Sequence, residues 1–364
     1  MMNKDNYCII MAGGVGSRFW PMSRLKKPKQ FLDVLGIGES LIQMTYRRIQ
    51  KICPQENIYI VTNEIYKNLV KEQLQGINEN NIVTEPARRN TAPCITYANF
   101  KIGAINENAN IIVAASDHLI LNEDEFVKTV NKALEVTKES DVLVTLGIKP
   151  SYPNTGYGYI QFDNNDFIPK DRDIKKVKIF TEKPDLEMAK KFIESGDFLW
   201  NSGIFVWSLK SINKALSQYL PEVYNIFLKG QDYYNTDKED SFINEAYTSC
   251  PAISIDYGVM EKAGNVYVIP SDFGWSDVGT WKALYNVREK DENSNTIIGK
   301  NVMVYGTKNS IVNVPKDKLV VLQGLDGYIV VESEGVLMIC KKEEEQRVKQ
   351  FITDIEVQKG IEYL

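Results

Sequence analysis

Short apolar runs alternate with amphipathic stretches through the first half of the chain. The first run, Tyr7–Ala12, ends at glycines and predicts a buried strand, and Ser40 is a suitable N-cap for a helix that continues to about Ile52. The same alternation predicts strands at Ile58–Val61, Ile111–Ala115 and Val142–Gly147, and helices after Thr91 and across Asp124–Glu139. Alternation at this spacing predicts a mainly parallel sheet covered on both faces by helices.

The pattern changes in the second half of the chain. From about Thr155, the stretches "GYG", "FTEKP" and "WNSGIF" are spaced among strands and loops, which indicates a substrate-binding half within the same domain. After about Asn293 the alternation fades, and residues 296–340 contain several short β-branched runs. We therefore expect a catalytic domain of residues 1–293 and a small domain of residues 294–364, all-β and followed by a charged helical tail.

Composition narrows the class of protein. The chain has 364 residues, 43% of them hydrophobic, which suffices for a packed core. No run approaches the ~18 apolar residues of a membrane-spanning helix, and the apolar part of "MMNKDNYCIIMAGG" is too short for a signal peptide. The formal net charge of −5 argues against a nucleic-acid-binding protein. We expect a cytoplasmic location, with neither a membrane nor a nucleic acid as partner.

Cysteine and histidine usage excludes several kinds of site. No two cysteines are close in sequence, which excludes a zinc ribbon or a CxxC redox motif and fits reduced thiols: Cys8, Cys53, Cys94, Cys250 and Cys340. His118 is the one histidine in the sequence. Any Ser-His-Asp or Cys-His mechanism would therefore depend on that single residue, and a zinc site with several histidines is impossible.

The stretch "MAGGVGSRFWPMSRLKKPKQFL" has three glycines near its start, then five cations and no acid. Glycine-rich loops bind phosphates because their N–H groups approach the oxygens without an intervening Cβ. The P-loop pattern fails at Arg18 and the dinucleotide pattern fails at Phe19, while Pro21 and Pro28 prevent a helix directly after the glycines. The stretch predicts a long cationic loop that holds a polyanion such as a nucleoside triphosphate. The alternative is a turn followed by a solvated basic surface.

Two polar segments follow predicted strands. The glycine-rich stretch follows Tyr7–Ala12, and Ser116–His118 follows Ile111–Ala115. In parallel sheets, ligands bind beyond the carboxyl ends of the strands. We therefore expect both segments to lie at the ligand-binding edge of the sheet.

Gly13–Gln30 follows the pattern GGxGxRxxPxSxxxxPKQ, which resembles the signature of the sugar-nucleotide pyrophosphorylases, a family of nucleotidyltransferases. Its ending, PKQF, is similar to the mannose-1-phosphate guanylyltransferase branch. The match continues in order, and covers residues 7–284, through "EPARRNTAPCI", "ASDHLI", "TGYGYI", "TEKP", "WNSGIF", "SIDYGVMEK" and "GWSDVGTW". The resemblance implies an α/β fold: a Rossmann-like, GT-A-type mixed sheet with helices on both faces, and a small C-terminal domain like a left-handed β-helix. Bifunctional relatives continue into a cupin isomerase domain; because this chain stops at Leu364, we do not expect that second activity.

The resemblance implies a specific reaction. GTP and α-D-mannose 1-phosphate give GDP-mannose and pyrophosphate when the sugar phosphate attacks the α-phosphorus in line. The sugar phosphate is already an anionic nucleophile, so the reaction needs no general base and no covalent intermediate. Positioning and neutralisation of charge would then supply the catalysis.

The resemblance also implies the metal and triphosphate residues. Asp117 and Asp277 match the family's metal-binding aspartates, and Mg²⁺ commonly takes one or two carboxylates with phosphate oxygens and waters. Asp117 alone could equally be a helix N-cap. Arg18 and Lys29 are the cations carried over to the triphosphate, and Arg18 is expected to act in the transition state because a guanidinium can bridge two phosphate groups. We interpret His118 as a structural residue rather than a catalyst.

The same resemblance assigns residues to the nucleotide. Gly13 and Gly14 present N–H groups to it, and the stretch with Glu85, Arg89, Asn90 and Thr91 meets the guanine end. Guanine recognition needs an acceptor for N1–H and N2–H₂ and donors for O6, and this stretch offers both. Alternatively, Arg89–Thr91 is a good helix N-cap sequence, and we expect Thr91 to have that role.

The sugar phosphate is expected to meet a separate set of residues: Gly158, Glu182, Lys183, Asn201 and Gly203. Carboxylate and amide groups would bind hydroxyls, the glycines would allow close approach, and Lys183 would meet the phosphate. The alternative for "EKP" is a helix start, because proline is favoured in a first turn.

Two other interpretations stay open. The same chemistry could act on another sugar 1-phosphate, such as a heptose, or the chain could be a regulatory homologue that binds a nucleotide sugar without catalysis. Retention of Arg18, Lys29, Asp117, Lys183 and Asp277 argues against the second. We also expect a homodimer, because an apolar β-rich tail often buries itself against a partner, and we expect the tail after Asn293 to take no direct part in the chemistry.

Overall fold

The computed structural model describes residues 3–169 and 171–364. The chain forms two compact units. The first comprises Met1–Gly13, Tyr46–Ser116 and Ile120–Trp275, and the second comprises Gly14–Thr45, Asp117–Leu119 and Ser276–Leu364. In the described part of the chain, no helix has the length and apolar character to cross a membrane.

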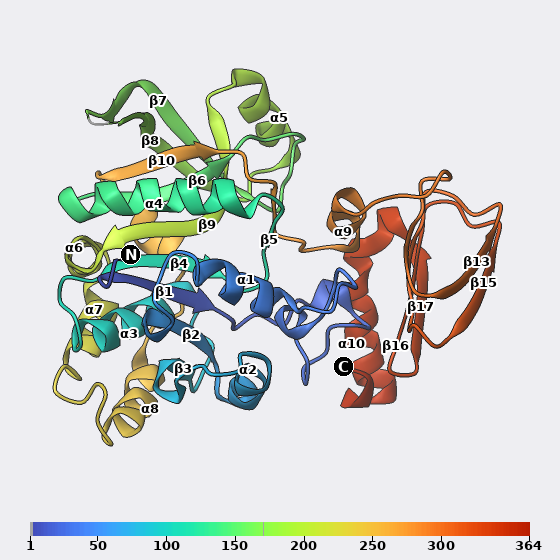
Figure 1. Cartoon of the computed structure of the whole chain (residues 1–364), viewed down its shortest axis with the longest axis horizontal. Coiled ribbons are helices and arrows are strands. Elements are labelled where there is room, and N and C mark those ends of the chain that lie inside the picture. The colour runs from blue at the N-terminus through green and yellow to red at the C-terminus, as the bar shows by residue number, and fades with distance from the viewer. Residues whose placement is uncertain (1–2, 170) are drawn as a thin grey trace. The chain divides into compact units, whose positions relative to one another are not determined.

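A mixed sheet forms the centre of the first unit (Figure 1). Its strand order is β3-β2-β1-β4-β9-β6-β10-β8-β7. The strands are β1 (Asn6–Met11), β2 (Ile58–Asn63), β3 (Ile82–Glu85), β4 (Asn110–Ala115), β6 (Leu143–Ile148), β7 (Gly158–Ile168), β8 (Asp171–Glu182), β9 (Phe198–Ser208) and β10 (Val266–Ser271). Neighbouring strands among β3, β2, β1 and β4 are parallel, whereas β9 is antiparallel to both β4 and β6. The mixed α/β sheet expected from the resemblance is confirmed.

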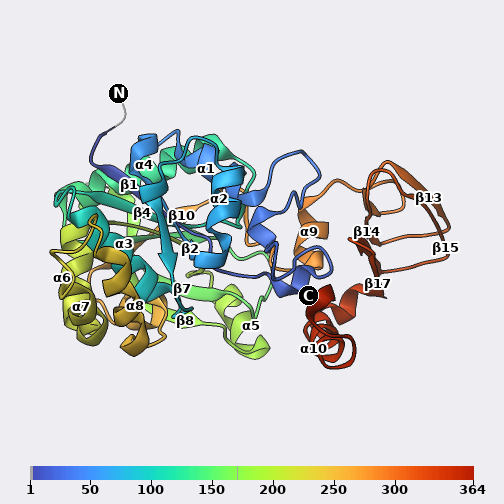
Figure 2. The same ribbon diagram turned by 90° about the horizontal axis from the view of Figure 1, so that it is seen from below.

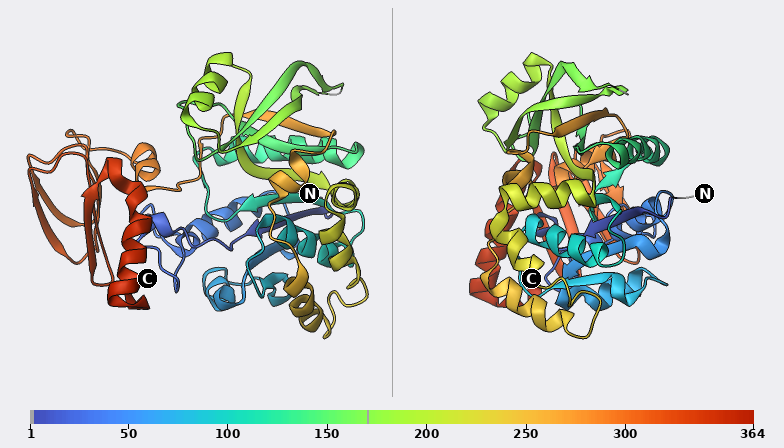
Figure 3. Two further views of the ribbon diagram at one scale, coloured as in Figure 1. Left: turned by 180° about the vertical axis from the view of Figure 1, so that it is seen from behind. Right: turned by 90° about the vertical axis from the view of Figure 1, so that its left-hand side faces the viewer.

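Helices cover both faces of this sheet. Figure 2 shows α4 (Glu123–Glu139) on one side and α3 (Thr91–Gly103) and α6 (Leu209–Tyr219) on the other. α7 (Pro221–Leu228) packs on α3 and α6, and Figure 3 shows this helical layer from behind, together with α8 (Glu239–Ser249). The first unit also contains α2 (Lys67–Gln73) and α5 (Leu186–Ser195).

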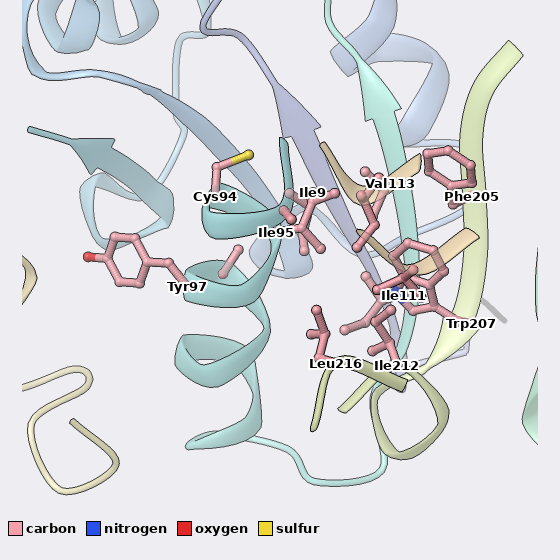
Figure 4. Packing of buried hydrophobic residues seen from close by; sticks show 14 of the residues in the cluster. Ile9, Cys94, Ile95, Tyr97, Ile111, Val113, Phe205, Trp207, Ile212 and Leu216 are labelled. Carbon is pink, nitrogen blue, oxygen red and sulfur yellow. The ribbon is translucent and has the colours of Figure 1, made fainter. Parts of the chain in front are cut away.

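The core between the sheet and α3 follows from the repeat of side-chain directions in strands, about two residues, and in helices, about 3.6 residues. Alternate strand residues point to one face, so Ile9, Ile111 and Trp207 from three adjacent strands meet Ile95 of α3 and Ile212 of α6 (Figure 4). All five side chains are fully buried. This packing fixes the carboxyl ends of β1 and β4, where Met11 pairs with Ala115.

The second unit contains the β-helix-like segment. β12 (Thr296–Ile298), β14 (Ile311–Asn313) and β16 (Tyr328–Ser333) pair in parallel, β17 (Val336–Lys341) closes that sheet, and β13 (Asn301–Tyr305) pairs in parallel with β15 (Leu319–Gln323). Because the strands alternate between two sheets along the chain, each coil stacks on the one before, and the valine-rich runs enclose Val312, Leu322 and Val330. The predicted β-helix-like domain is confirmed, while its left-handed sense stays a prediction.

The glycine-rich loop, which we define as the motif Gly13–Gln30, shares a core with the C-terminal helix. Phe19, the last residue of the first turn of this loop, η1 (Ser17–Phe19), and the next residue, Trp20, belong to one buried cluster with Trp281 of α9 (Trp281–Val287), Ile329 of β16 and Val348 of α10 (Val348–Lys359). The division into a catalytic domain of residues 1–293 and a tail domain of residues 294–364 concerns the roles of these segments and stays a prediction.

Candidate active site

The four residues predicted to be catalytic lie together in the second unit. They line a cavity of about 290 Å³, whose wall is formed by Gly16, Ser17, Arg18, Lys29, Asp117, His118, Asp277, Gly279 and Lys349. The nine residues of the wall come from four separate segments of the chain. The fold therefore brings together the four predicted residues, which the sequence related only by resemblance.

The conformation of the glycine-rich loop depends on Gly16. Its φ of 68° lies in the left-handed region, and a Cβ at this position would stand 2.4 Å from the Cβ of Lys29. Ser23 Oγ donates a hydrogen bond to the Gly16 carbonyl (2.7 Å), and the Lys29 N–H donates to the Val15 carbonyl (3.1 Å). The loop thus folds back so that Lys29 lies against its glycines.

Lys29 is buried, and its ammonium group joins both predicted metal ligands. Nζ lies 2.7 Å from Asp117 Oδ2 and donates hydrogen bonds to the backbone oxygens of Asp277 (2.8 Å) and Val278 (3.2 Å). The three N–H donors of the ammonium are thus matched by three oxygen atoms. In this arrangement Lys29 positions the two aspartates.

The backbone around Asp277 is strained. Val278 has φ of 41°, which is unfavourable for a β-branched residue, and its side chain is fully buried. Its N–H donates to Ser276 Oγ (3.1 Å), and the Gly279 N–H donates to Asp277 Oδ1 (2.9 Å). These contacts and the Lys29 bonds hold a conformation that places the Asp277 carboxylate in the cavity wall.

The environment of Asp117 keeps it ionised. Burial alone would raise the pKa of its carboxyl group, but the neighbouring Lys29, His118 and hydrogen bonds outweigh that effect and lower the pKa below its usual value. His118 Nε2 lies 4.0 Å from Asp117 Oδ1. A carboxylate that stays charged is what a divalent cation requires.

Two cations in the cavity wall have free donors. Among residues 3–169 and 171–364, neither the Arg18 guanidinium nor the Lys349 ammonium makes a hydrogen bond or an ion pair, in contrast to Lys29. Three cations thus face two carboxylates in this wall. The arrangement favours an anionic ligand with several charges.

The residues expected at the guanine end belong to the first unit. Glu85, at the end of β3, is buried and accepts a hydrogen bond from Tyr247 OH (2.9 Å), and burial raises its pKa to about 7. Arg89 Nε donates to the Tyr247 carbonyl (3.2 Å). Gly13 lies close to the same carboxylate, since a Cβ there would be 3.9 Å from Glu85 Oε2. Glu85 and Arg89 are therefore linked through Tyr247.

Asn90 and Thr91 have structural contacts. Asn90 has φ of 68° and is the N-cap of α3, with Oδ1 accepting a hydrogen bond from the Thr91 N–H (2.9 Å). Thr91 Oγ1 accepts from the Ile255 N–H (2.9 Å). The N-cap role that we expected for Thr91 belongs to Asn90, because the helix begins one residue earlier than a Thr91 cap would require.

The residues expected at the sugar phosphate come together, also in the first unit. Gly158 pairs with Glu182 across β7 and β8, and a Cβ on Gly158 would lie 2.1 Å from Glu182 Oε1 and 3.3 Å from the Asn201 Cβ. The Gly203 N–H donates to Asn201 Oδ1 (3.1 Å), and Lys183 Nζ lies 3.5 Å from Glu182 Oε2. The absence of a side chain at Gly158 thus leaves space for the Glu182 carboxylate.

Comparison with known proteins decides the family. Residues 7–294 match the family model described as nucleotidyl transferase, and residues 299–355 match the one described as MannoseP isomerase/GMP-like beta-helix domain. The mannose-1-phosphate guanylyltransferase of Salmonella muenchen is 36% identical over 94% of this chain and 72% of its own length. The chain belongs to the mannose-1-phosphate guanylyltransferase family. This agrees with the resemblance seen in the sequence.

Other members of the family and a solved structure agree with this membership. The mannose-1-phosphate guanylyltransferase of Klebsiella pneumoniae is 35% identical over 98% of this chain and 75% of its own length. The crystal structure of a mannose-1-phosphate geranyltransferase from Thermus thermophilus superposes with a TM-score of 0.86 and 28% identity, covering 97% of this chain and 99% of that one. The similarity therefore extends over both units of this nucleotidyltransferase.

The cavity residues fit the magnesium ion expected in this family. Within the described residues, no group of three or more His, Cys, Asp or Glu side chains is arranged to hold a metal. Mg²⁺ does not need one, because it keeps several waters and takes its other ligands from one or two carboxylates and the substrate phosphates. Asp117 and Asp277, which line one cavity, are the two carboxylates that would hold the ion.

Three residues of these clusters escaped the sequence predictions. Asp256 accepts a hydrogen bond from Asn201 Nδ2 (2.9 Å), and burial together with the charge of Glu182 raises its pKa to about 6. Asp256 lies within the matched motif "SIDYGVMEK", so a signal for it existed. Tyr247 and Lys349 lie outside every matched motif. We expected the tail after Asn293 to take no direct part in the chemistry, which stays a prediction; Lys349 of α10 nevertheless lines the cavity, so the tail contributes to the wall of the candidate site.

Proposed function

We propose that this enzyme transfers GMP from GTP to α-D-mannose 1-phosphate and releases pyrophosphate and GDP-mannose. The observation that carries the proposal is the single cavity that contains Arg18, Lys29, Asp117 and Asp277. Its free cations and paired carboxylates suit a metal-bound polyphosphate. The names of the similar proteins supply the choice of GTP and mannose 1-phosphate.

The chain's own residues account for the reaction without a general base. A phosphate oxygen of mannose 1-phosphate forms a bond to the α-phosphorus of GTP, and the bond to the bridging oxygen of pyrophosphate breaks. Arg18 binds the leaving pyrophosphate, where negative charge accumulates. Lys29 holds Asp117 and the Asp277 backbone in place. Asp117 and Asp277 would hold Mg²⁺, which would supply positive charge to the phosphate oxygens.

Recognition of the two substrates rests on the clusters of the first unit. Glu85 and Arg89 offer an acceptor and donors to the guanine edge. Glu182, Asn201 and Asp256 offer acceptors and a donor to sugar hydroxyls, and Lys183, whose ammonium is largely exposed, meets the sugar's phosphate. Gly13, Gly14 and Gly203 allow the backbone to approach the ligands closely.

A substrate panel tests the proposal. The full chain is incubated with GTP, Mg²⁺ and a set of sugar 1-phosphates that includes mannose and a heptose, and pyrophosphate release is measured. Release that is fastest with mannose 1-phosphate supports the proposal, and faster turnover of the heptose reassigns the sugar. Binding of GDP-mannose without turnover of any sugar 1-phosphate would make the chain a regulatory homologue.

We also propose that the enzyme is a homodimer in the cytoplasm. The outer face of the β13–β15 sheet exposes Met303, Tyr305, Leu319 and Val321, an apolar surface of the kind that a second copy covers. Light scattering after gel filtration measures the mass, and Val321→Glu should shift a dimer towards the monomer. A monomeric wild-type chain at high concentration would exclude this dimer.

A further inference from the structure

Lys349 is held beside Arg18 by packing within the second unit. Val348, the residue before it, is fully buried in the same cluster as Phe19, the residue after Arg18. Helix α10 also contacts the first turn of the glycine-rich loop, and Lys349 itself is exposed at the cavity wall. A buried neighbour on each chain segment therefore places two cationic side chains at one opening.

Further contacts fix the position of α10. The Trp20 indole Nε1 donates a hydrogen bond to the Tyr363 carbonyl (2.8 Å), which ties the loop to the end of the chain. The Glu345 carboxylate, just before α10, is buried and accepts from the Lys282 N–H at the start of α9 (2.8 Å). The helix that carries Lys349 is thus anchored at both ends to segments that form the site.

Charge identifies the kind of ligand that Lys349 would meet. Lys29 is already neutralised by Asp117 at 2.7 Å. In the described part of the chain the ammonium of Lys349 has no carboxylate or carbonyl partner, and it shares the cavity wall with Gly16, Ser17 and Arg18 of the glycine-rich loop. An exposed ammonium beside a guanidinium and backbone N–H groups is suited to a polyphosphate.

We propose that Lys349 binds the pyrophosphate part of the nucleoside triphosphate and, after reaction, the released pyrophosphate. The C-terminal domain then supplies a substrate-binding side chain to the site, in addition to its structural role. This inference rests on the proposed function for the identity of the triphosphate. The ammonium makes no covalent bond; it adds one positive charge where two phosphate groups lie.

The test compares Lys349→Ala with a matched lysine on the same helix. Lys359 is ten residues further along α10, about 15 Å by helical rise, and is absent from the cavity wall. Equilibrium binding of Mg²⁺–pyrophosphate is measured by calorimetry, and the KM values for GTP and mannose 1-phosphate are measured in the forward reaction. Binding of pyrophosphate does not depend on turnover, so a failure of the proposed function remains distinguishable from a failure of this inference.

Lys349→Ala should weaken binding of pyrophosphate and raise the KM for GTP by about 10–100-fold, with little change in the KM for mannose 1-phosphate. Lys359→Ala should behave as the wild type, and Lys349→Arg should restore most of the binding. Wild-type affinity of Lys349→Ala for pyrophosphate would overturn the inference. An equal loss in Lys359→Ala would also overturn it, because the helix rather than the side chain would then be responsible.

Discussion

Lys29 Nζ lies 2.7 Å from Asp117 Oδ2, and the same ammonium donates a hydrogen bond to the backbone oxygen of Asp277. One buried cation thus joins the two carboxylate residues that are proposed to hold the metal. In the sequence the three residues lie on three separate segments. The geometry points to Lys29 as a positioning residue for the two aspartates of the proposed metal site.

Lys29→Met should disable the metal site. Methionine keeps most of the length of the side chain but leaves the partly exposed Asp117 carboxylate without its cation and the Asp277 and Val278 carbonyls without their donor, which should destabilise the site. We expect kcat/KM to fall about 100-fold or more, the concentration of Mg²⁺ for half-maximal activity to rise, and the melting temperature to drop. Lys26→Met is the matched control, because Lys26 belongs to the same motif, Gly13–Gln30, but is exposed. Unchanged magnesium dependence in Lys29→Met would contradict the positioning role.

Asp277→Asn tests the metal ligands directly. The amide is a weaker ligand for Mg²⁺ than the carboxylate, so activity should collapse while the fold survives, and excess EDTA should abolish activity of the wild type. Circular dichroism and thermal unfolding check the fold, and release of pyrophosphate measures activity. Asp317→Asn, at an exposed position in the same unit, should leave both activity and thermal unfolding unchanged. Full activity of Asp277→Asn would remove this residue from the mechanism.

Glu85 should make binding of GTP depend on pH. Burial raises its pKa to about 7, while the hydrogen bond from Tyr247 opposes that rise. An acceptor for N1–H and N2–H₂ of guanine must be ionised, so GTP affinity should increase as pH rises from about 6 to 8. Folding stability should change in the opposite direction. Because the pKa of Glu85 is raised in the folded state, the folded protein should become less stable as pH rises from the unfolded pKa of about 4.3 to about 7.

Two variants separate Glu85 from the titration of the nucleotide itself. Glu85→Gln should bind GTP weakly and lose the added pH dependence, since the amide does not titrate. Tyr247→Phe removes the bond that lowers the pKa, so the midpoint of the pH dependence should move upward. Calorimetric titrations between pH 6 and 8.5 measure both effects. Identical pH profiles for wild type and Glu85→Gln would exclude Glu85 from guanine recognition.

Gly158→Ala should damage the sugar cluster selectively. An added Cβ would stand 2.1 Å from Glu182 Oε1, so the carboxylate must move. We expect the KM for mannose 1-phosphate to rise about tenfold or more, with a smaller effect on GTP. Gly264→Ala is the control, because its Cβ meets no atom within 4 Å. Equal KM values for Gly158→Ala and Gly264→Ala would show that Glu182 does not contact the sugar.

Local patterns predicted most of the elements but not the direction of β9 or the contacts of Lys29. Apolar runs marked the strands, and Ser40 marked the start of α1 (Leu41–Ile49), where its Oγ accepts a hydrogen bond from the Gln43 N–H (3.4 Å). A strand pattern carries no information on direction, so β9 could not be recognised as antiparallel. The bonds of Lys29 join distant segments, and only the fold determines them.

The tail was the least predictable part of the site. Lys349 lies in the stretch "KKEEEQRVKQ", which has the composition of a solvated charged helix. Nothing in that composition distinguishes Lys349 from Lys342 or Lys359. The distinction arises because Val348 is buried against the glycine-rich loop, which fixes the rotation of α10 and directs the next residue to the cavity.

Truncation of Arg18 and truncation of Lys183 to alanine should change different kinetic parameters. Both are cations assigned to phosphates, but Lys183 belongs to the sugar cluster and its ligand is charged before the reaction begins. Lys183→Ala should therefore raise the KM for mannose 1-phosphate strongly, with a smaller effect on GTP. Arg18 lies on the glycine-rich loop with free donors in the cavity wall, where we propose that negative charge develops on the leaving pyrophosphate.

A donor whose contact strengthens in the transition state acts mainly on kcat, and losing one such charge commonly costs about 10²–10³-fold. Arg18→Ala should lose kcat by that order while GTP still binds, which steady-state kinetics and calorimetry measure together. Arg24→Ala is a matched arginine on the same loop, where its guanidinium donates to the Ser333 carbonyl (2.8 Å) instead of lining the cavity. If Arg18→Ala retained kcat and only bound GTP less tightly, the glycine-rich loop would hold the nucleotide without stabilising the transition state.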